Sequence, residues 1–243
     1  MIARRARPPP LAEGRKLRAV VTDVDGTLTD RDRRIDPRAV EAVRRLEADG
    51  VPVILATGNV LPIALALHRF LGLSGPIVAE NGGVIYRTTA RGPRVVRLAD
   101  PRGPRAALGA LRSVGVPVRR LFTDRWRETE VALEPTVSVG RIRRALAGRE
   151  ITVESTGFAI HLMERGRGKL PALVRALAPI GLAPPDCVVL GDGDNDVEML
   201  RAAGFSVSFP SASVRARRAA RYVTRNDHAA GFVEGLKESG TLR

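Results

Sequence analysis

The chain has 243 residues, of which 44% are apolar, and a formal net charge of +14. This length and apolar content predict one large folded domain or two smaller ones and exclude a disordered chain. No apolar run approaches the roughly 18–20 residues that cross a bilayer, and the N-terminus lacks the apolar segment of a secretory signal, so we expect a cytoplasmic protein. The single cysteine, Cys187, excludes an internal disulfide and agrees with that location.

Arginine supplies almost all of the positive charge, because lysine occurs only at Lys16, Lys169 and Lys237. The arginines are spread along the predicted helices, where they attract small anions and bind nucleic acid without specificity at low salt. Only 4% of the residues are aromatic and no zinc-ligand spacing occurs, so specific nucleic-acid recognition is not expected. Abundant arginine beside few Asn, Gln and Cys residues is typical of proteins from high-temperature hosts.

Short apolar strands and amphipathic helices alternate after a basic, proline-rich tail over residues 1–16. The first predicted helix, for example, places Val40, Val43 and Leu46 on one face. Such alternation with short links indicates βαβ units and a parallel sheet. The predicted elements are strands at 19–21, 51–56 and 77–79 and helices at 37–49 and 62–71.

The pattern changes between residues 84 and 164, which begin with a predicted hairpin and read as an inserted α+β cap domain. Strand–helix alternation then resumes and continues to the C-terminus. We therefore predict an α/β fold: a Rossmann-like, doubly wound parallel sheet built from residues 17–83 and 165–243, with the cap over 84–164. The predicted cap elements are strands at 84–86, 95–98, 118–122, 130–133, 151–155 and 158–163 and helices at 105–114 and 137–147.

Polar residues gather where the predicted core strands end. The opening strand, for example, leads directly into Asp23 and Asp25, whose side chains project to the same side of an extended segment. Because the carboxyl ends of parallel strands meet at one edge of a sheet, we expect the polar clusters to converge there. The clusters are Asp23 with Asp25, Thr57 with Gly58, Lys169 at the start of a helix, and Asp192 with Asn195 and Asp196.

Carboxylates without nearby His or Cys favour a hard cation such as Mg²⁺, held by Asp23, Asp192 and the main-chain carbonyl of Asp25. Lys169 and the hydroxyl of Thr57 can hold and neutralise a phosphoryl group. Asp23 can then attack phosphorus to give an aspartyl-phosphate, while Asp25 carries the proton for the leaving oxygen and for the incoming water. The sequence therefore predicts phosphoryl-transfer chemistry on a small anionic phosphoester.

These motifs resemble those of the haloacid dehalogenase superfamily of phosphohydrolases: DVDGTLTD, the Thr-Gly of TGN, a lysine after an insertion, and GDGDND. The similarity covers nearly the whole chain from residue 17, and an insertion between the second and third motifs matches members with an α+β cap. The segments TGNVLP, AENGGVIY and AIHL are similar to those of archaeal-type phosphoglycolate phosphatases. The resemblance implies a Mg²⁺-dependent phosphatase that converts 2-phosphoglycolate into glycolate and phosphate.

The resemblance also implies a role for each matched residue. Asp23 is then the nucleophile and Asp25 the acid/base; Thr57, with Gly58 beside it, and Lys169 bind phosphate. The resemblance assigns four residues to the magnesium site: Asp23, Asp25, Asp192 and Asp196, the last directly or through water. Asn195 is then the residue that orients the fourth motif. Asn59 stands where many sugar-phosphatase relatives carry Arg, and Gly168 precedes Lys169 where those relatives have glycine after the lysine.

Several alternatives stay open at this point. A phosphatase for a sugar or sugar-acid phosphate, such as mannosyl-3-phosphoglycerate, uses the same core motifs. A phospho-accepting signalling domain also combines an acidic cluster, Mg²⁺, Thr and Lys, although the insertion and Asp25 disfavour it. The protein is expected to be a monomer or a homodimer.

Some candidates outside the motifs remain as well. Asn81 is expected to fix a turn where the cap joins the core, and His161 is expected to be a packing residue. A substrate carboxylate has several candidate partners in the cap and directly after it: Arg125, Arg127, Arg165 and Arg167.

Overall fold

The computed structural model describes residues 17–156 and 158–242, so the tail predicted over residues 1–16 lies outside the described residues. The strands are β1 (Ala19–Thr22), β2 (Val53–Ala56), β3 (Ile77–Ala79), β4 (Val84–Thr89), β5 (Gly92–Arg97), β6 (Val131–Leu133), β7 (Ile151–Ser155), β8 (Ile160–Glu164), β9 (Cys187–Leu190), β10 (Phe205–Ser208) and β11 (Tyr222–Val223). The α-helices are α1 (Pro37–Ala48), α2 (Leu61–Leu71), α3 (Arg102–Ser113), α4 (Val139–Ala145), α5 (Lys169–Leu177), α6 (Val197–Ala202), α7 (Val214–Ala219) and α8 (His228–Glu238). The 3₁₀ turns include η1 (Glu80–Gly82) and η2 (Phe122–Trp126).

The core is an eight-stranded sheet in the order β11-β10-β9-β1-β2-β3-β4-β5. The six strands from β11 to β3 are parallel, and β4 and β5 continue the sheet in antiparallel pairing. Every residue of β1, β2, β9 and β10 is buried, as expected for parallel strands covered on both faces. The predicted α/β core is therefore present.

The order of the strands creates a switch point between β1 and β9. From β1 the chain moves outward through β2 to β3, whereas β9 lies on the other side of β1 and leads outward to β10 and β11. Right-handed crossovers then place α1 and α2 on one face and α6 and α7 on the other. Consistent with this, α1 contacts α2 and α8, and α6 contacts α5 and α7. Ligands of open α/β sheets bind at such a switch point.

Local sequence explains where the first helix begins. Asp36 is in extended conformation, and its carboxylate accepts a hydrogen bond from the backbone N–H of Arg38 at 2.8 Å. Pro37 occupies the first turn, where its missing N–H costs nothing. The apolar face of α1 buries Ala39, Ala42, Val43 and Leu46 against the sheet.

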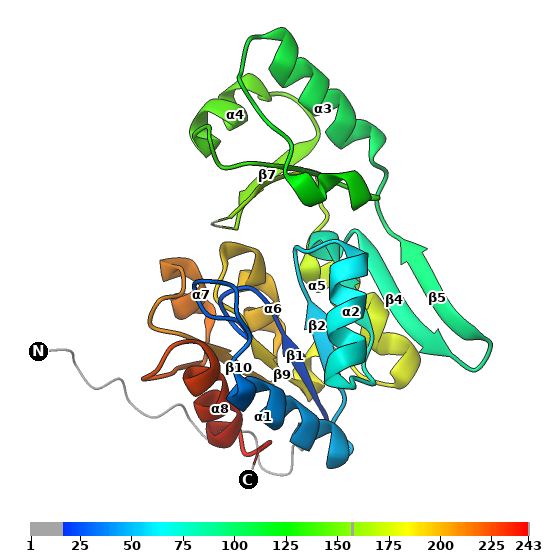
Figure 1. The fold of residues 1–243 in the computed structure, drawn as a ribbon, viewed down its shortest axis with the longest axis vertical. Coiled ribbons are helices and arrows are strands. Elements are labelled where there is room, and N and C mark those ends of the chain that lie inside the picture. The colour runs from blue at the N-terminus through cyan, green and yellow to red at the C-terminus, as the bar shows by residue number, and fades with distance from the viewer. Residues whose placement is uncertain (1–16, 157, 243) are drawn as a thin grey trace, which may run out of the picture.

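The hairpin that we predicted as the start of the cap belongs to the core sheet instead. β4 pairs with β3 along its first three residues, with Val84 opposite Ala79, and β5 forms the outer edge. Figure 1 shows this hairpin standing beside the core rather than in the upper lobe. The sequence could not decide this, because a hairpin with one apolar face fits either sheet.

The upper lobe in Figure 1 contains a three-stranded antiparallel sheet in the order β6-β8-β7, with α3 and α4 packed on one face. A separate apolar cluster, including Leu111, Ile142 and Leu162, lies between these helices and the sheet. The strand predicted at 118–122 is wrong: this segment makes only an isolated bridge, Arg120 to Leu133, and then turns into η2. The pairing of this segment with β6 ends there because the backbone N–H of Ala132 donates to the carboxylate of Asp124 at 2.6 Å.

Within residues 17–156 and 158–242, no helix combines the length and the apolar character that crossing a membrane requires.

Candidate active site

Two adjacent parallel strands deliver the first carboxylates of the site. Asp23 follows β1 directly, and Asp192 lies two residues after the end of β9. Thr22 is paired with Leu190 in the sheet, and the N–H of Asp23 donates to the carbonyl of Leu190 at 3.0 Å. Both acids therefore leave the sheet at the same level, beside the switch point.

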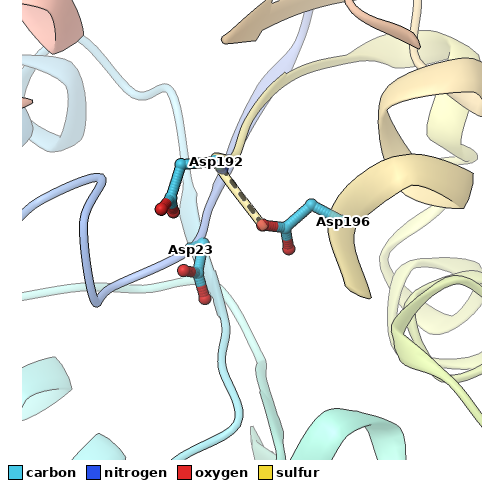
Figure 2. Close-up of side chains that lie close together, drawn as sticks. All are labelled: Asp23, Asp192 and Asp196. Atoms are coloured by element: carbon cyan, nitrogen blue, oxygen red, sulfur yellow. Dashed lines mark hydrogen bonds between the residues drawn. The ribbon is translucent and has the colours of Figure 1, made fainter. Parts of the chain in front are cut away.

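Asp196 and Lys169 complete this cluster. One ligand oxygen from each of Asp23, Asp192 and Asp196 lies within 4.8 Å of the others. Figure 2 shows the three carboxylates and the hydrogen bond from the backbone N–H of Asp192 to Asp196, which measures 3.2 Å. The ammonium of Lys169 lies 2.7 Å from Oδ1 of Asp23 and 2.7 Å from Oδ1 of Asp196. The predicted convergence of these four residues is thus observed.

The cluster carries three carboxylates against one ammonium, and this imbalance perturbs its pKa values. Burial raises the pKa of Asp23 well above its usual range, against the opposing effect of Lys169. Burial, together with the charge of Asp196, raises the pKa of Asp192 to about 6. Burial alone lowers the pKa of Lys169, but Asp196 and Asp23 outweigh it and raise that pKa above its usual value. The net negative charge of the cluster therefore favours the binding of a further cation.

The donor atoms of the cluster fit a hard divalent cation. All three acidic groups present carboxylate oxygens, and neither His nor Cys belongs to the group. Oxygen-only donors suit Mg²⁺ or Ca²⁺ rather than softer metals. The excess negative charge found above is what such a cation neutralises when bound.

Tight turns hold the cluster in place. Gly26 has a φ of 84°, and a Cβ at this position would collide with the carboxylate of Asp192, so only glycine fits. The hydroxyl of Thr27 donates to Oδ1 of Asp192 at 3.0 Å, and the backbone N–H of Gly193 donates to Asp196 at 2.9 Å. These contacts fix the direction of two carboxylates before any ligand binds.

Asp25 lies next to the cluster but has other partners. Its Oδ2 accepts a hydrogen bond from the amide of Asn59 at 2.5 Å, and its Oδ1 accepts one from Nε of Arg33 at 2.9 Å. The three-acid cluster does not include the side chain of Asp25. Thr57, behind Asn59, is fully buried, and its Oγ1 accepts from the backbone N–H of Asn59 at 3.0 Å. The side chain of Asp25 thus lies beside the cluster and is bound by Asn59 and Arg33.

A cavity of about 330 Å³ lies above these acids, between the core and the cap. Core residues form its floor. The cap contributes residues from β7 and from the turn that follows it. Of the predicted site residues, Thr57, Lys169 and Asp196 lie behind this surface rather than on it. The cavity is lined by Asp23, Asp25, Gly58, Ser155, Thr156, Phe158, Asp192, Gly193, Asp194, Asn195 and Ser213.

A buried carboxylate at the start of η1 attaches the cap to the core. Glu80 accepts hydrogen bonds from the backbone N–H groups of Glu128 and Thr129, at 3.0 and 2.9 Å, and from the hydroxyl of Thr129 at 2.7 Å. Burial raises the pKa of Glu80. Three donors from the cap thus converge on one core side chain.

Asn81 connects the fourth motif with the cap. Its Oδ1 accepts from the amide of Asn195 at 3.0 Å, and its Nδ2 donates to Oε2 of Glu130 at 3.1 Å. Its φ of 51° agrees with the turn predicted at this position. Asn195 lines the cavity, so Asn81 links a cavity residue to the buried interior of the cap.

His161 is part of a polar network and not the packing residue that we predicted. It is fully buried, and its two ring nitrogens lie 3.0 Å from Glu130 and 3.1 Å from the hydroxyl of Thr156. Arg127 binds Glu130 and donates to the carbonyl of Gly58 at 2.9 Å. Burial favours the neutral form of Glu130, but Arg127 and His161 outweigh it and lower its pKa.

None of the four arginines predicted as carboxylate ligands lines the cavity. The guanidinium of Arg125 stacks on the exposed rings of Phe122 and Trp126. Arg127 is buried against Glu130, as described above. The other two make ion pairs outside the cavity lining: Arg165 with Glu150 and Arg167 with Glu164.

Sequence comparison provides independent information on the family. The family model described as "haloacid dehalogenase-like hydrolase" matches residues 20–94 and 135–236. A curated phosphoglycolate phosphatase of Methanothermobacter thermautotrophicus is 38% identical over 91% of this chain and 98% of its own length. The phosphoglycolate phosphatase of Archaeoglobus fulgidus is 34% identical over 94% of this chain and 99% of its own length.

Solved structures agree with the sequence comparison. A crystal structure from Thermoplasma acidophilum superposes with a TM-score of 0.84 at 28% identity, over 93% of this chain and 100% of that one. A haloacid dehalogenase-like hydrolase of Bacteroides thetaiotaomicron shares the fold, with a TM-score of 0.73 at 20% identity over 93% and 99% of the two chains. The chain belongs to the family of haloacid dehalogenase-like hydrolases.

Proposed function

We propose that the protein is a Mg²⁺-dependent phosphatase that hydrolyses 2-phosphoglycolate to glycolate and phosphate. The observation that carries the proposal is the cluster of Asp23, Asp192 and Asp196, with Lys169 paired to Asp23 and Asp196, at and beneath the floor of a cavity between core and cap. The archaeal relatives named phosphoglycolate phosphatase, at 34–38% identity, support the choice of substrate.

The first half-reaction uses Asp23 and Asp25. A carboxylate oxygen of Asp23 attacks phosphorus, the bond between phosphorus and the ester oxygen breaks, and Asp23 becomes phosphorylated. Asp25 donates its proton to the departing oxygen, which leaves as the hydroxyl of glycolate. The buried ammonium of Lys169, 2.7 Å from Asp23, lowers the repulsion between the nucleophile and the phosphoryl group.

The second half-reaction regenerates the enzyme. Asp25, now ionised, removes a proton from the attacking water, and the bond between phosphorus and Asp23 breaks as phosphate leaves. In this proposal Mg²⁺ is held by Asp23, Asp192, Asp196 and the backbone carbonyl of Asp25, and when bound it supplies Lewis-acid neutralisation of the phosphoryl oxygens. Thr57 and Gly58, with Asn195 opposite, hold and orient the phosphate.

The cap completes the proposed site. Ser155, Thr156 and Phe158 face the core acids across the cavity, so the leaving group lies between cap and core. Enclosure of this kind excludes water that competes with the substrate for the polar groups. We place the cap between residues 98 and 165 and assign the hairpin of β4 and β5 to the catalytic core, in agreement with their pairing in the large sheet.

The test is an initial-rate panel of phosphomonoesters with and without Mg²⁺. We expect phosphate release to require Mg²⁺ and to be fastest with 2-phosphoglycolate, and Asp23→Asn to abolish it. A strong preference for a hexose phosphate or for mannosyl-3-phosphoglycerate refutes the substrate assignment. A phosphoprotein that persists without phosphate release indicates a signalling domain instead.

We further propose that the protein acts in the cytoplasm, as a monomer or homodimer, on small anionic substrates and not on specific nucleic acids. The formal charge of +14 supports an anionic substrate through long-range attraction.

A further inference from the structure

One arginine of the core, Arg33, reaches the boundary between the cavity acids and the cap. Its Nε donates to Oδ1 of Asp25 at 2.9 Å, and its guanidinium carbon lies 4.5 Å from the ring centroid of Phe158. Asp25 and Phe158 both line the cavity, one from the core and one from the cap. The side chain of Arg33 is half exposed. Among the described residues, this Nε contact is the only hydrogen bond of its guanidinium, so two nitrogens are available to a ligand.

The backbone around Arg33 is built to hold this position. Arg33 has a φ of 63°, a left-handed conformation that costs a non-glycine residue free energy. The surrounding turn fixes it: Oδ1 of Asp30 accepts the N–H groups of Asp32 and Arg34, each at 2.9 Å, and the N–H of Arg33 donates to the carbonyl of Asp30 at 3.0 Å. A strained residue held by three hydrogen bonds is typical of a functional position.

The cavity lining carries an excess of negative charge, which the guanidinium of Arg33 can offset when an anionic substrate binds. Four carboxylates line the cavity, those of Asp23, Asp25, Asp192 and Asp194, whereas Lys169 lies beneath the floor and is already paired with two acids. A substrate with both a phosphate and a carboxylate brings further negative charge into this space. The four arginines predicted as carboxylate ligands have partners elsewhere. Arg33 is therefore the guanidinium placed to receive a second anionic group.

The position of Asp25 indicates where the carboxylate of the substrate lies. In the proposed reaction Asp25 contacts the ester oxygen, so the atoms bonded to that oxygen lie beside Asp25 and under Phe158. In 2-phosphoglycolate a single methylene separates the ester oxygen from the carboxylate. The guanidinium that now binds Asp25 is within reach of that carboxylate, and its planar fork matches the two oxygens.

From this arrangement we infer that Arg33 binds the carboxylate of the leaving group and gives the enzyme its preference for phosphoesters of short hydroxy acids. This inference rests on the proposed phosphatase function. The two terminal nitrogens of Arg33 bind the two oxygens of the substrate carboxylate, while its Nε keeps the hydrogen bond to Asp25. Phe158 supports the guanidinium from the cap side, so the subsite takes residues from both core and cap.

Two substrates that differ at a single group separate this role from others. 2-Phosphoglycolate and ethyl phosphate differ only in that a methyl group replaces the carboxylate. The variant Arg33→Met keeps an unbranched apolar stem against Phe158 but removes the charge, and Arg33→Lys keeps the charge without the planar fork. Arg31→Met changes the net charge equally at an exposed position of the same loop and is the matched control.

We expect Arg33→Met to raise the KM for 2-phosphoglycolate about 10- to 100-fold, because one charge-assisted bidentate contact is lost. The kcat/KM for ethyl phosphate, which has no carboxylate for Arg33 to bind, should fall much less than the kcat/KM for 2-phosphoglycolate. With 2-phosphoglycolate, Arg33→Lys should have a KM between those of the wild type and Arg33→Met. The control should match the wild type with both substrates. If Arg33→Met lowers kcat/KM equally for both esters, or changes neither, the inference is overturned while the phosphatase assignment stands. If the wild type releases no phosphate from 2-phosphoglycolate, both are overturned.

Discussion

The raised pKa of Asp192 predicts that replacing its carboxylate by a neutral group stabilises the metal-free protein against unfolding. An acid with a pKa of 3.8 in the unfolded chain and about 6 in the folded one favours the protonated form on folding. Below pH 3.8 both states are protonated and the penalty is absent; it develops between pH 3.8 and 6 and is complete above pH 6. The difference corresponds to about 3 kcal/mol at pH 7.5.

The variant Asp192→Asn removes this penalty and keeps the local geometry, because an amide oxygen still accepts the hydrogen bond from Thr27. We expect the metal-free variant to be up to about 3 kcal/mol more stable than the wild type at pH 7.5 and nearly equal to it at pH 4. Urea denaturation in the presence of EDTA measures both values. Added Mg²⁺ at about 100 times its Kd should then stabilise the wild type by about 2.7 kcal/mol and the variant much less.

Asp194→Asn is the matched control, because Asp194 is exposed in the same loop and its carboxylate binds Ser213 and Arg215. This change should alter the free energy of unfolding by less than about 0.5 kcal/mol. A metal-free Asp192→Asn protein less stable than the wild type at pH 7.5, or a stabilisation that is the same at pH 4, would refute the electrostatic reasoning.

Three further predictions follow from the same contacts. Lys169→Met should lower the free energy of unfolding of the metal-free protein by about 3–5 kcal/mol, since it leaves two buried carboxylates without their cation; an unchanged urea midpoint contradicts this. Calorimetric titration should find Mg²⁺ bound about tenfold more weakly at pH 5 than at pH 7, because Asp192 is protonated below its pKa of about 6; a pH-independent Kd excludes that role. Glu80→Gln should weaken the attachment of the cap by about 1–3 kcal/mol and speed amide hydrogen exchange at Glu128 and Thr129, and unaltered exchange rates would argue against it.

The convergence of the acidic cluster could be predicted from sequence because it depends on strand order alone. Asp23 and Asp192 each follow a short apolar strand, and parallel strands bring their carboxyl ends to one edge. Lys169 was assigned through its place at the start of the helix after the insertion, and the structure puts its ammonium between two of the acids. The chemical roles of these residues remain proposals.

The boundary of the cap could not be predicted in the same way. The hairpin of β4 and β5 has a pattern that fits an edge of either sheet, and only the pairing of Val84 with Ala79 places it in the core. The segment around residues 118–122 looks like a strand because its residues are β-formers, but Asp124 binds the N–H of Ala132 and ends the pairing. Both outcomes depend on tertiary contacts that local propensity does not contain.

The polar network between core and cap was missed for a related reason. Glu80, Glu130 and His161 lie far apart in the chain, and no local spacing connects them. Arg33 was missed because it stands among other arginines in an exposed loop. Its left-handed backbone and its contacts with Asp25 and Phe158 become visible only in three dimensions.

The central claim is that Asp23 carries the phosphoryl group during turnover. Rapid acid quenching of a single turnover with 2-phosphoglycolate, followed by mass spectrometry of the tryptic peptide over residues 19–31, tests this claim directly. We predict one added phosphoryl group on Asp23 in the wild type and none in Asp23→Asn. Phosphate release by the wild type without any phosphorylated peptide at any quench time would contradict the account.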